Sequence, residues 1–229
     1  MFTLSSVVPW GRSFDEYRRM FALTGADLGG RILGCGDGPA SFNAEGTRQG
    51  SDIVSCDPLY RFGAAQIRQR IDETAPEVLE QARQNAHEFV WDEAIPDLDA
   101  LKRVRMRAMS AFLADYETGR VQGRYLDAGL PSLPFADGAF DLALCSHFLF
   151  LYSQQLDESF HLRSMRDLCR VARDVRIFPL VALGGQPSPH LGAVREALSR
   201  DGWHASIEPV PYEFQRGGNE MLRVKRSID

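Results

Sequence analysis

The segment that decides the fold is Gly30-Arg-Ile-Leu-Gly-Cys-Gly-Asp-Gly-Pro-Ala-Ser-Phe-Asn-Ala-Glu45. Its first residues end a short apolar strand, and glycines then occupy every second position, at Gly34, Gly36 and Gly38. Because glycine has no Cβ, the backbone can turn sharply there and a ligand can lie against it. Pro39 suits the first position of a helix, where a backbone N–H has no partner. The segment predicts a strand, a turn and a helix over 40–48, with a nucleotide-like ligand at the turn.

The composition is that of one ordinary α/β domain. The chain has 229 residues, 44% of them hydrophobic, which is enough for a substantial core. The net charge of −5 argues against a nucleic-acid binder, which usually carries a basic stripe. No run approaches the ~18 apolar residues of a membrane span. The stretch Met1–Trp10 lacks the features of a signal peptide, so a cytoplasmic protein is expected. The four cysteines include no CxxC pair, so neither a metal site nor a disulfide framework is expected.

Hydrophobic periodicity predicts the elements on either side of the glycine segment. Ser13-Phe-Asp-Glu16 has the pattern of a capping box and begins a helix that ends before Gly25. Asp52–Cys56 is a compact apolar run and is predicted to be the second strand. That strand ends at Asp57, 21 positions after Gly36, which is the distance that one helix and a crossover need.

The stretch that follows Asp57 is too long for a plain crossover. A βαβ unit takes about 30 residues in all, whereas 67 residues separate Asp57 from the strand expected at Tyr125. Residues 60–123 are therefore predicted to be a helical insertion and a possible lid. Thr74-Ala-Pro-Glu77 has the pattern of a second capping box that begins one helix, and Asp97–Tyr116 carries the apolar stripe of another.

The remaining elements complete an alternation of strands and helices. The segments predicted as strands are Arg124–Asp127, Phe140–Cys145, Val175–Leu180, His204–Val210 and Met221–Lys225. A helix is expected to begin at Ser188-Pro189. Alternation predicts a Rossmann-like, mostly parallel α/β sheet of seven strands with helices on both faces. The last two strands have no helix between them, so they predict an antiparallel terminal hairpin within a single domain over 1–229.

The glycine spacing and two further features identify a family resemblance. In the nicotinamide-binding pattern G-x-G-x-x-G the third glycine would fall on Pro39, so the pattern fails. The spacing G-x-G-x-G instead resembles motif I of the class I S-adenosylmethionine (SAM)-dependent methyltransferases. Leu133-Pro-Phe-Ala-Asp-Gly-Ala-Phe-Asp-Leu-Ala-Leu-Cys-Ser-His147 is similar to the segment around the fourth strand of that family, and the terminal hairpin suits its last strand. The resemblance covers most of residues 25–226 except the insertion.

The resemblance implies SAM as the cofactor and assigns residues to it. The glycine loop from Gly34 to Gly38 would line the methionine part and the ribose, and Asp57 would accept hydrogen bonds from the two ribose hydroxyls. The other implied cofactor-binding residues in this sequence are Arg12, Tyr17, Cys35, Asp37, Pro58, Leu59, Asp127, Leu130, Cys145 and Ser146. Of these, Arg12 is a candidate partner for the methionine carboxylate, although a surface arginine is an equally good interpretation.

Two positions depart from the family pattern. The family usually has an acid two residues before the first glycine, where it helps to bind the methionine amino group, but this sequence has Ile32. The amino group then needs another acceptor, and Asp37 or a backbone carbonyl is possible. The adenine-binding acid is also displaced, because the usual spacing from Leu133 gives Gly129. Either Asp127 serves or the backbone N–H of Leu130 alone contacts the adenine.

Methyl transfer from SAM needs no metal and no nucleophilic triad, because proximity and alignment supply much of the rate. His147 is the candidate general base, since it follows a central strand at its carboxyl end, with Tyr152 as a weaker candidate. The predicted function is methyl transfer to a small-molecule acceptor, with no nucleic-acid or membrane partner, and the oligomeric state is open. A SAM-binding domain without transferase activity is the alternative, and an NAD-dependent oxidoreductase is a remote one.

Overall fold

One seven-stranded sheet forms the centre of the computed structural model, which describes residues 8–226. Its strands lie in the order β3-β2-β1-β4-β5-β7-β6. The first five of these are parallel, and β7 runs antiparallel to both β5 and β6. The strands are β1 (Arg31–Cys35), β2 (Asp52–Cys56), β3 (Tyr125–Leu126), β4 (Phe140–Ser146), β5 (Ala172–Phe178), β6 (Trp203–Pro209) and β7 (Glu220–Arg226). The predicted Rossmann-like sheet with its antiparallel terminal hairpin is confirmed.

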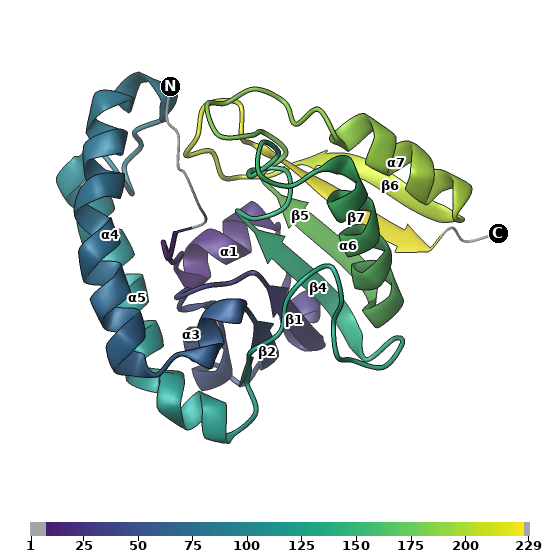
Figure 1. Cartoon of the computed structure of the whole chain (residues 1–229), viewed down its shortest axis with the longest axis horizontal. Helices are drawn as coiled ribbons and strands as arrows, with labels where there is room; N and C mark the ends of the chain where they lie inside the picture. The colour runs from purple at the N-terminus through teal and green to yellow at the C-terminus, as the bar shows by residue number, and fades with distance from the viewer. Residues whose placement is uncertain (1–7, 227–229) are drawn as a thin grey trace.

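Helices cover both faces of the sheet and extend beyond one end of it (Figure 1). The helices are α1 (Phe14–Met20), α2 (Gly25–Leu28), α3 (Phe42–Arg48), α4 (Ala64–Gln84), α5 (Leu98–Val121), α6 (Glu158–Val171) and α7 (Leu191–Arg200), with 3₁₀ turns η1 (Pro58–Arg61) and η2 (Ala86–Glu88). In the part of the chain that the structure describes, no helix combines the length and the apolar character needed to cross a bilayer.

Successive residues of the inner strands point to opposite faces and belong to two separate cores. Leu33 and Ala143 pack on one side with residues of α6 and α7, such as Met165. Ile32 and Leu142 pack on the other side with aromatic rings of α1 and α3. This period-two division is what a parallel strand covered on both faces requires.

The insertion between β2 and β3 forms an antiparallel helical pair, which Figure 1 shows at the side of the molecule next to α3. A hydrogen-bonded path joins it to the glycine loop. The Tyr116 hydroxyl of α5 donates to the carbonyls of Tyr60 (2.9 Å) and Phe62 (2.8 Å), and the Tyr60 hydroxyl donates to the carbonyl of Gly38 (2.8 Å). The helical pair is thus fastened to the loop that begins the fold.

Several predicted boundaries were wrong for local reasons. Thr74 does not cap a helix: it lies inside α4, where its hydroxyl donates to the carbonyl of Arg70, and Pro76 is also inside that helix. Pro39 does not begin α3, because Ala40 closes a turn onto Asp37 and the helix starts after Ser41.

Three further boundaries differ. Thr24 caps a short additional helix, α2, with Asp27 completing a capping box. β5 begins at Ala172 rather than at Val175, and α7 begins after His190 rather than at Ser188. Most of the N-terminal stretch from which no signal peptide was expected, residues 1–7, lies outside the described residues.

Candidate functional site

A cavity of about 470 Å³ opens at the carboxyl ends of β1, β2 and β4. Chain crossovers leave β1 toward β2 on one side, while β4 lies on its other side, so the cavity is at the switch point where open α/β sheets bind ligands. Its volume is within the range of small-molecule sites. The sequence-predicted residues that line it are Arg12, Tyr17, Cys35, Gly36, Asp37, Gly38, Asp57, Pro58, Leu59, Leu130, Ser146, His147 and Tyr152.

The glycine loop is shaped by one side chain of its own. A Cβ on Gly34 would lie 1.8 Å from Oδ2 of Asp37, so the carboxylate of Asp37 folds back over the strand where only glycine fits. Gly36 has a φ of +70°, which other residues rarely adopt, and its N–H donates to the carbonyl of Cys56 (2.9 Å). Gly34 was expected to line the ligand site. Asp37 covers Gly34 instead, and it is Asp37 that lines the cavity.

Asp37 is a buried carboxylate with one donor on each oxygen. The Tyr17 hydroxyl donates to Oδ1 (2.8 Å) and the Ser55 hydroxyl donates to Oδ2 (2.6 Å). Burial raises the pKa of Asp37 to about 6, with a further contribution from the nearby charge of Asp57, although both hydrogen bonds lower it. The group is 7% exposed and lines the cavity, so an ionised Asp37 is a negative charge that favours a cation there.

Asp57 ends β2 and fixes the next turn. Its Oδ2 accepts from the N–H of Gly38 (2.9 Å) and its Oδ1 accepts from the N–H of Leu59 (2.7 Å). Burial raises the pKa of Asp57. Each carboxylate oxygen can accept more than one hydrogen bond, so both remain available to a pair of hydroxyls in the cavity.

His147 follows β4 in a constrained backbone conformation. Its φ is +54°, in the left-handed region, and its N–H donates to the carbonyl of Phe178 (2.7 Å). The imidazole Nδ1 lies 2.9 Å from the Ser146 hydroxyl. Burial lowers the pKa of His147 well below its usual range, and the charges of Arg12 and Arg105 lower it further. The imidazole is therefore neutral at pH 7 and has an unprotonated nitrogen.

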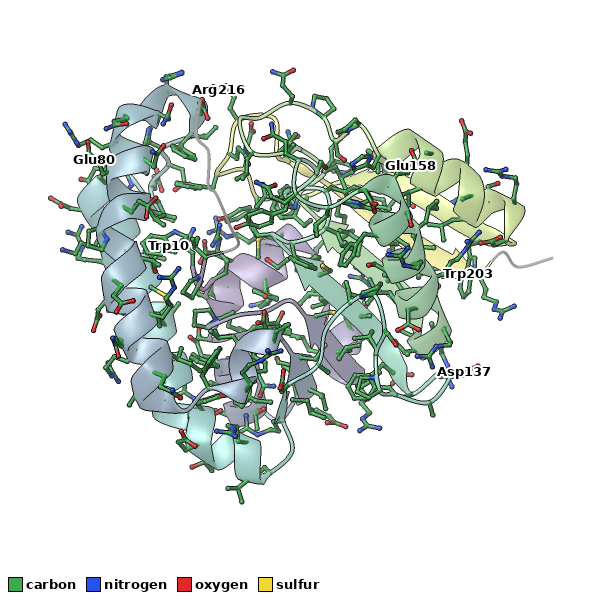
Figure 2. All side chains as sticks on the ribbon, in the orientation of Figure 1. Trp10, Glu80, Asp137, Glu158, Trp203 and Arg216 are labelled. Carbon is green, nitrogen blue, oxygen red and sulfur yellow. The ribbon has the colours of Figure 1, made fainter. Side chains whose placement is uncertain are left out.

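The far end of the cavity is apolar and is built partly by the insertion. The helical pair and the turn between its helices contribute Val78, Ala82, Phe89 and Leu101. Phe214 stacks on Phe89, with ring centroids 4.9 Å apart. Trp10 also lines this end, and Figure 2 shows it between the helical pair and α1. These residues come from distant parts of the sequence, and no sequence pattern assigned them to a site.

Three sequence-predicted residues do not line the cavity. Gly34 lies beneath Asp37, and Cys145 is a fully buried residue of the core. Asp127 is half exposed and pairs with Arg61 (3.4 Å), which itself lines the cavity. Within residues 8–226 no three His, Cys, Asp or Glu side chains are grouped to hold a metal ion.

The chain resembles known proteins in sequence and in fold. No family model matches it. It is 34% identical over 224 residues to the uncharacterized protein MJ0045 of Methanocaldococcus jannaschii, covering 97% of this chain and 98% of that protein. Among solved structures, the mitomycin 7-O-methyltransferase MmcR aligns with a TM-score of 0.50 and 14% identity over 93% of this chain and 54% of its own. Magnesium protoporphyrin IX methyltransferase from Synechocystis PCC 6803, with bound SAM, aligns with a TM-score of 0.49 and 13% identity over 93% and 78%. The chain therefore belongs to the same family as MJ0045, and its fold is that of the class I SAM-dependent methyltransferases.

Proposed function

We propose that this protein is a SAM-dependent methyltransferase that acts on a small molecule. The observation that carries the proposal is the cavity itself. It runs without interruption from Asp37 and Asp57 at the glycine loop to the apolar wall formed by Phe89 and Leu101. A cofactor held at the first end would meet an acceptor held at the second, inside a space of about 470 Å³ that suits small molecules.

The residues at the glycine-loop end fit SAM in charge and in hydrogen bonding. Asp57 would accept hydrogen bonds from both ribose hydroxyls, and Pro58 and Leu59 would lie against the adenine. Asp37 would accept from the methionine ammonium, which gives its buried carboxylate the cation that it lacks. The role that the family usually gives to an acid at position 32 would thus pass to position 37, since Ile32 is completely buried in the core.

The adenine end is assigned to backbone rather than to Asp127. The Asp127 carboxylate forms an ion pair with Arg61 and does not line the cavity, whereas Leu130 does. We therefore assign recognition of the adenine edge to the backbone N–H of Leu130. Cys35 and Ser146, which also line the cavity, would offer backbone groups near the methionine end.

SAM supplies an electrophilic methyl group on a sulfonium, so the protein has mainly to align the acceptor and remove its proton. His147 would accept that proton as the acceptor atom bonds to the methyl carbon. Its imidazole is neutral at pH 7 and is oriented by Ser146. α4 and α5 would exclude water from the acceptor end, which is the lid role predicted for residues 60–123.

Two experiments in sequence test the function. Calorimetry with SAM, S-adenosylhomocysteine (SAH) and NADH should detect the first two ligands and not the third. The topology also disfavours NADH, because the dinucleotide-binding sheet has no antiparallel β7. Methyl-tritiated SAM is then incubated with the low-mass fraction and, separately, with the RNA and protein fractions of a cell extract.

Label transferred only in the low-mass fraction supports a small-molecule methyltransferase, and label transferred to RNA or protein overturns that acceptor class. SAM binding without transfer to any fraction supports the alternative of a SAM-binding domain without transferase activity. The residue Ile32, where the family usually has an acid, is the sequence feature behind that alternative. If neither SAM nor SAH binds, both the methyltransferase and the non-catalytic SAM-binding domain are excluded.

A further inference from the structure

Beside the acceptor end of the cavity, the buried Glu16 is paired with Arg105, and the charge of the neighbouring Arg12 acts on it as well. Nη1 of Arg105, on α5, donates to both oxygens of Glu16, on α1, at 2.6 and 2.7 Å. Glu16 also accepts from the backbone and hydroxyl of Ser13 and from the hydroxyl of Tyr212 (2.8 Å). Burial raises the pKa of Glu16, but the charges of Arg105 and Arg12 lower it to about 2, so Glu16 is ionised. The group of three side chains has a net charge of about +1 at pH 7.

The arginines have donors with no acceptor. Among the described residues, Nε of Arg12 and both Nε and Nη2 of Arg105 are buried without a hydrogen-bond partner. Burial and the charge of Arg105 lower the pKa of Arg12 to about 10, so the guanidinium remains charged at neutral pH. A buried cation with unmade hydrogen bonds is unfavourable by more than a typical hydrogen bond contributes. The cluster therefore lacks an anion.

The location of the cluster indicates where that anion binds. Arg12 lines the cavity, and the guanidinium of Arg105 lies 5.7 Å from the ring of Phe214, which lines it as well. Both arginine charges act on His147, at the acceptor end. The cluster therefore extends from the glycine loop, where the carbonyl of Arg12 accepts from the N–H of Ser41 (3.0 Å), to the aromatic wall at Phe214.

We propose that the acceptor is an aromatic carboxylic acid whose carboxylate binds Arg12, with Arg105 behind it. The surrounding wall supplies rings for an aromatic body, namely those of Trp10, Phe89, Tyr152 and Phe214. A guanidinium suits a carboxylate because it presents paired donors in one plane. The proposal rests on the proposed function, since it gives the class of substrate for the same cavity.

The methionine carboxylate of SAM is the other anion that could reach Arg12, as the sequence led us to expect. It shares a carbon atom with the ammonium that we assign to Asp37. We prefer the acceptor as the source of the anion because the arginines lie beside the aromatic wall of the cavity, and the experiment separates the two sources.

The test measures the affinity of the purified protein for matched acids and amides, with and without saturating SAH. Benzoate, 2-naphthoate and indole-3-carboxylate are each compared with the corresponding carboxamide, which has the same shape and no charge. We expect at least one acid to bind about 10- to 100-fold more tightly than its amide, as a charge-assisted hydrogen bond predicts. Arg12→Gln should abolish the preference, and Arg12→Lys should retain part of it.

Arg61→Gln is the matched control, because Arg61 lines the same cavity at the adenine end and should leave the preference unchanged. Thermal melting of each variant confirms that it folds. Equal affinity for acid and amide, binding of no acid, or a preference that survives in Arg12→Gln overturns the proposal. Loss in Arg12→Gln of affinity for SAH but not for 5′-methylthioadenosine also overturns it, because the anion would then be that of the cofactor. Failure of SAH to bind at all would overturn the proposed function instead, and the acid preference of the free protein would still be measurable.

Discussion

Replacing Asp37 by Asn should strengthen the fold and weaken the cofactor site at the same time. The folded protein raises the pKa of Asp37 from the usual 3.8 to about 6, chiefly by burial. A carboxyl with a raised pKa favours the folded state most when protonated, so its contribution to stability is lost as the pH rises from about 4 to about 6. This rise in the pKa of Asp37 corresponds to a loss of about 3 kcal/mol of unfolding free energy above that pH range. Asn carries no charge and avoids this loss.

The binding side of the prediction concerns the methionine ammonium. Loss of a charge-assisted hydrogen bond of about 1.5–3 kcal/mol should weaken SAH about 10- to 100-fold at pH 7.5. The ligand 5′-methylthioadenosine has the same nucleoside but no amino-acid part, so its affinity should not change. In the wild type, SAH affinity should fall as the pH drops below about 6 and Asp37 becomes protonated, whereas in Asp37→Asn it should be independent of that titration.

Urea denaturation at pH 5, 6 and 7.5 measures the first effect, and calorimetry with the two ligands measures the second. Asp57→Asn is the comparison variant. Asp57 is assigned to the ribose, which both ligands carry, so this variant should lower the affinity for both ligands together. If Asp37→Asn binds SAH like the wild type, or weakens both ligands equally, the assignment of Asp37 to the ammonium is wrong. The unfolding free energy of Asp37→Asn should exceed that of the wild type by more at pH 7.5 than at pH 5. If the difference does not grow with pH, the argument from burial is wrong.

Three further changes test other parts of the site. Gly34→Ala would place a Cβ 1.8 Å from Oδ2 of Asp37 and should lower the unfolding free energy by about 1–3 kcal/mol in urea denaturation, whereas Gly192→Ala, which has open space around it, should not. Arg105→Met removes the ion-pair partner of the buried Glu16 and should lower the unfolding free energy by about 3–5 kcal/mol. Arg103→Met, at an exposed position on the same helix, should be neutral, and equal effects would contradict the importance of the buried pair. His147→Asn should reduce the rate of methyl transfer about 10²- to 10⁴-fold with unchanged SAH affinity. The wild-type rate should show no inflection near pH 6.5, because the pKa of His147 lies well below that value. A matching fall in SAH affinity would assign His147 to the cofactor instead.

The parts of the fold that were predictable have local signals. The run from Phe140 is apolar at nearly every position because β4 is covered on both faces, and this composition is visible in the sequence. Gly36, Gly38 and Asp57 lie at one cavity because they follow β1 and β2, which are neighbouring strands of the same parallel sheet. Parallel strands bring their carboxyl ends to one edge whatever lies between them in the chain.

The parts that failed depend on distant contacts. Thr74 and Pro76 have a convincing capping pattern, but α4 continues through them because its apolar face, including Ile71 and Val78, is buried along its length. Tertiary packing overrides a local signal in this way. The pairing of Glu16 with Arg105 joins residues 89 positions apart, on two helices that no sequence pattern relates, so the arginine cluster could not have been anticipated.

The hydrogen-bonded path from Tyr116 through Tyr60 to Gly38 has a thermodynamic consequence. It links the helix that lines the acceptor end to the backbone that contacts the cofactor, so movement of α5 would disturb the glycine loop. Two ligands that stabilise the same connected element bind cooperatively. Linkage is reciprocal: whatever factor SAM applies to the affinity for the acceptor, the acceptor applies to the affinity for SAM. Tyr60→Phe, which removes only the hydroxyl to Gly38, should bring that factor closer to one without altering either pocket.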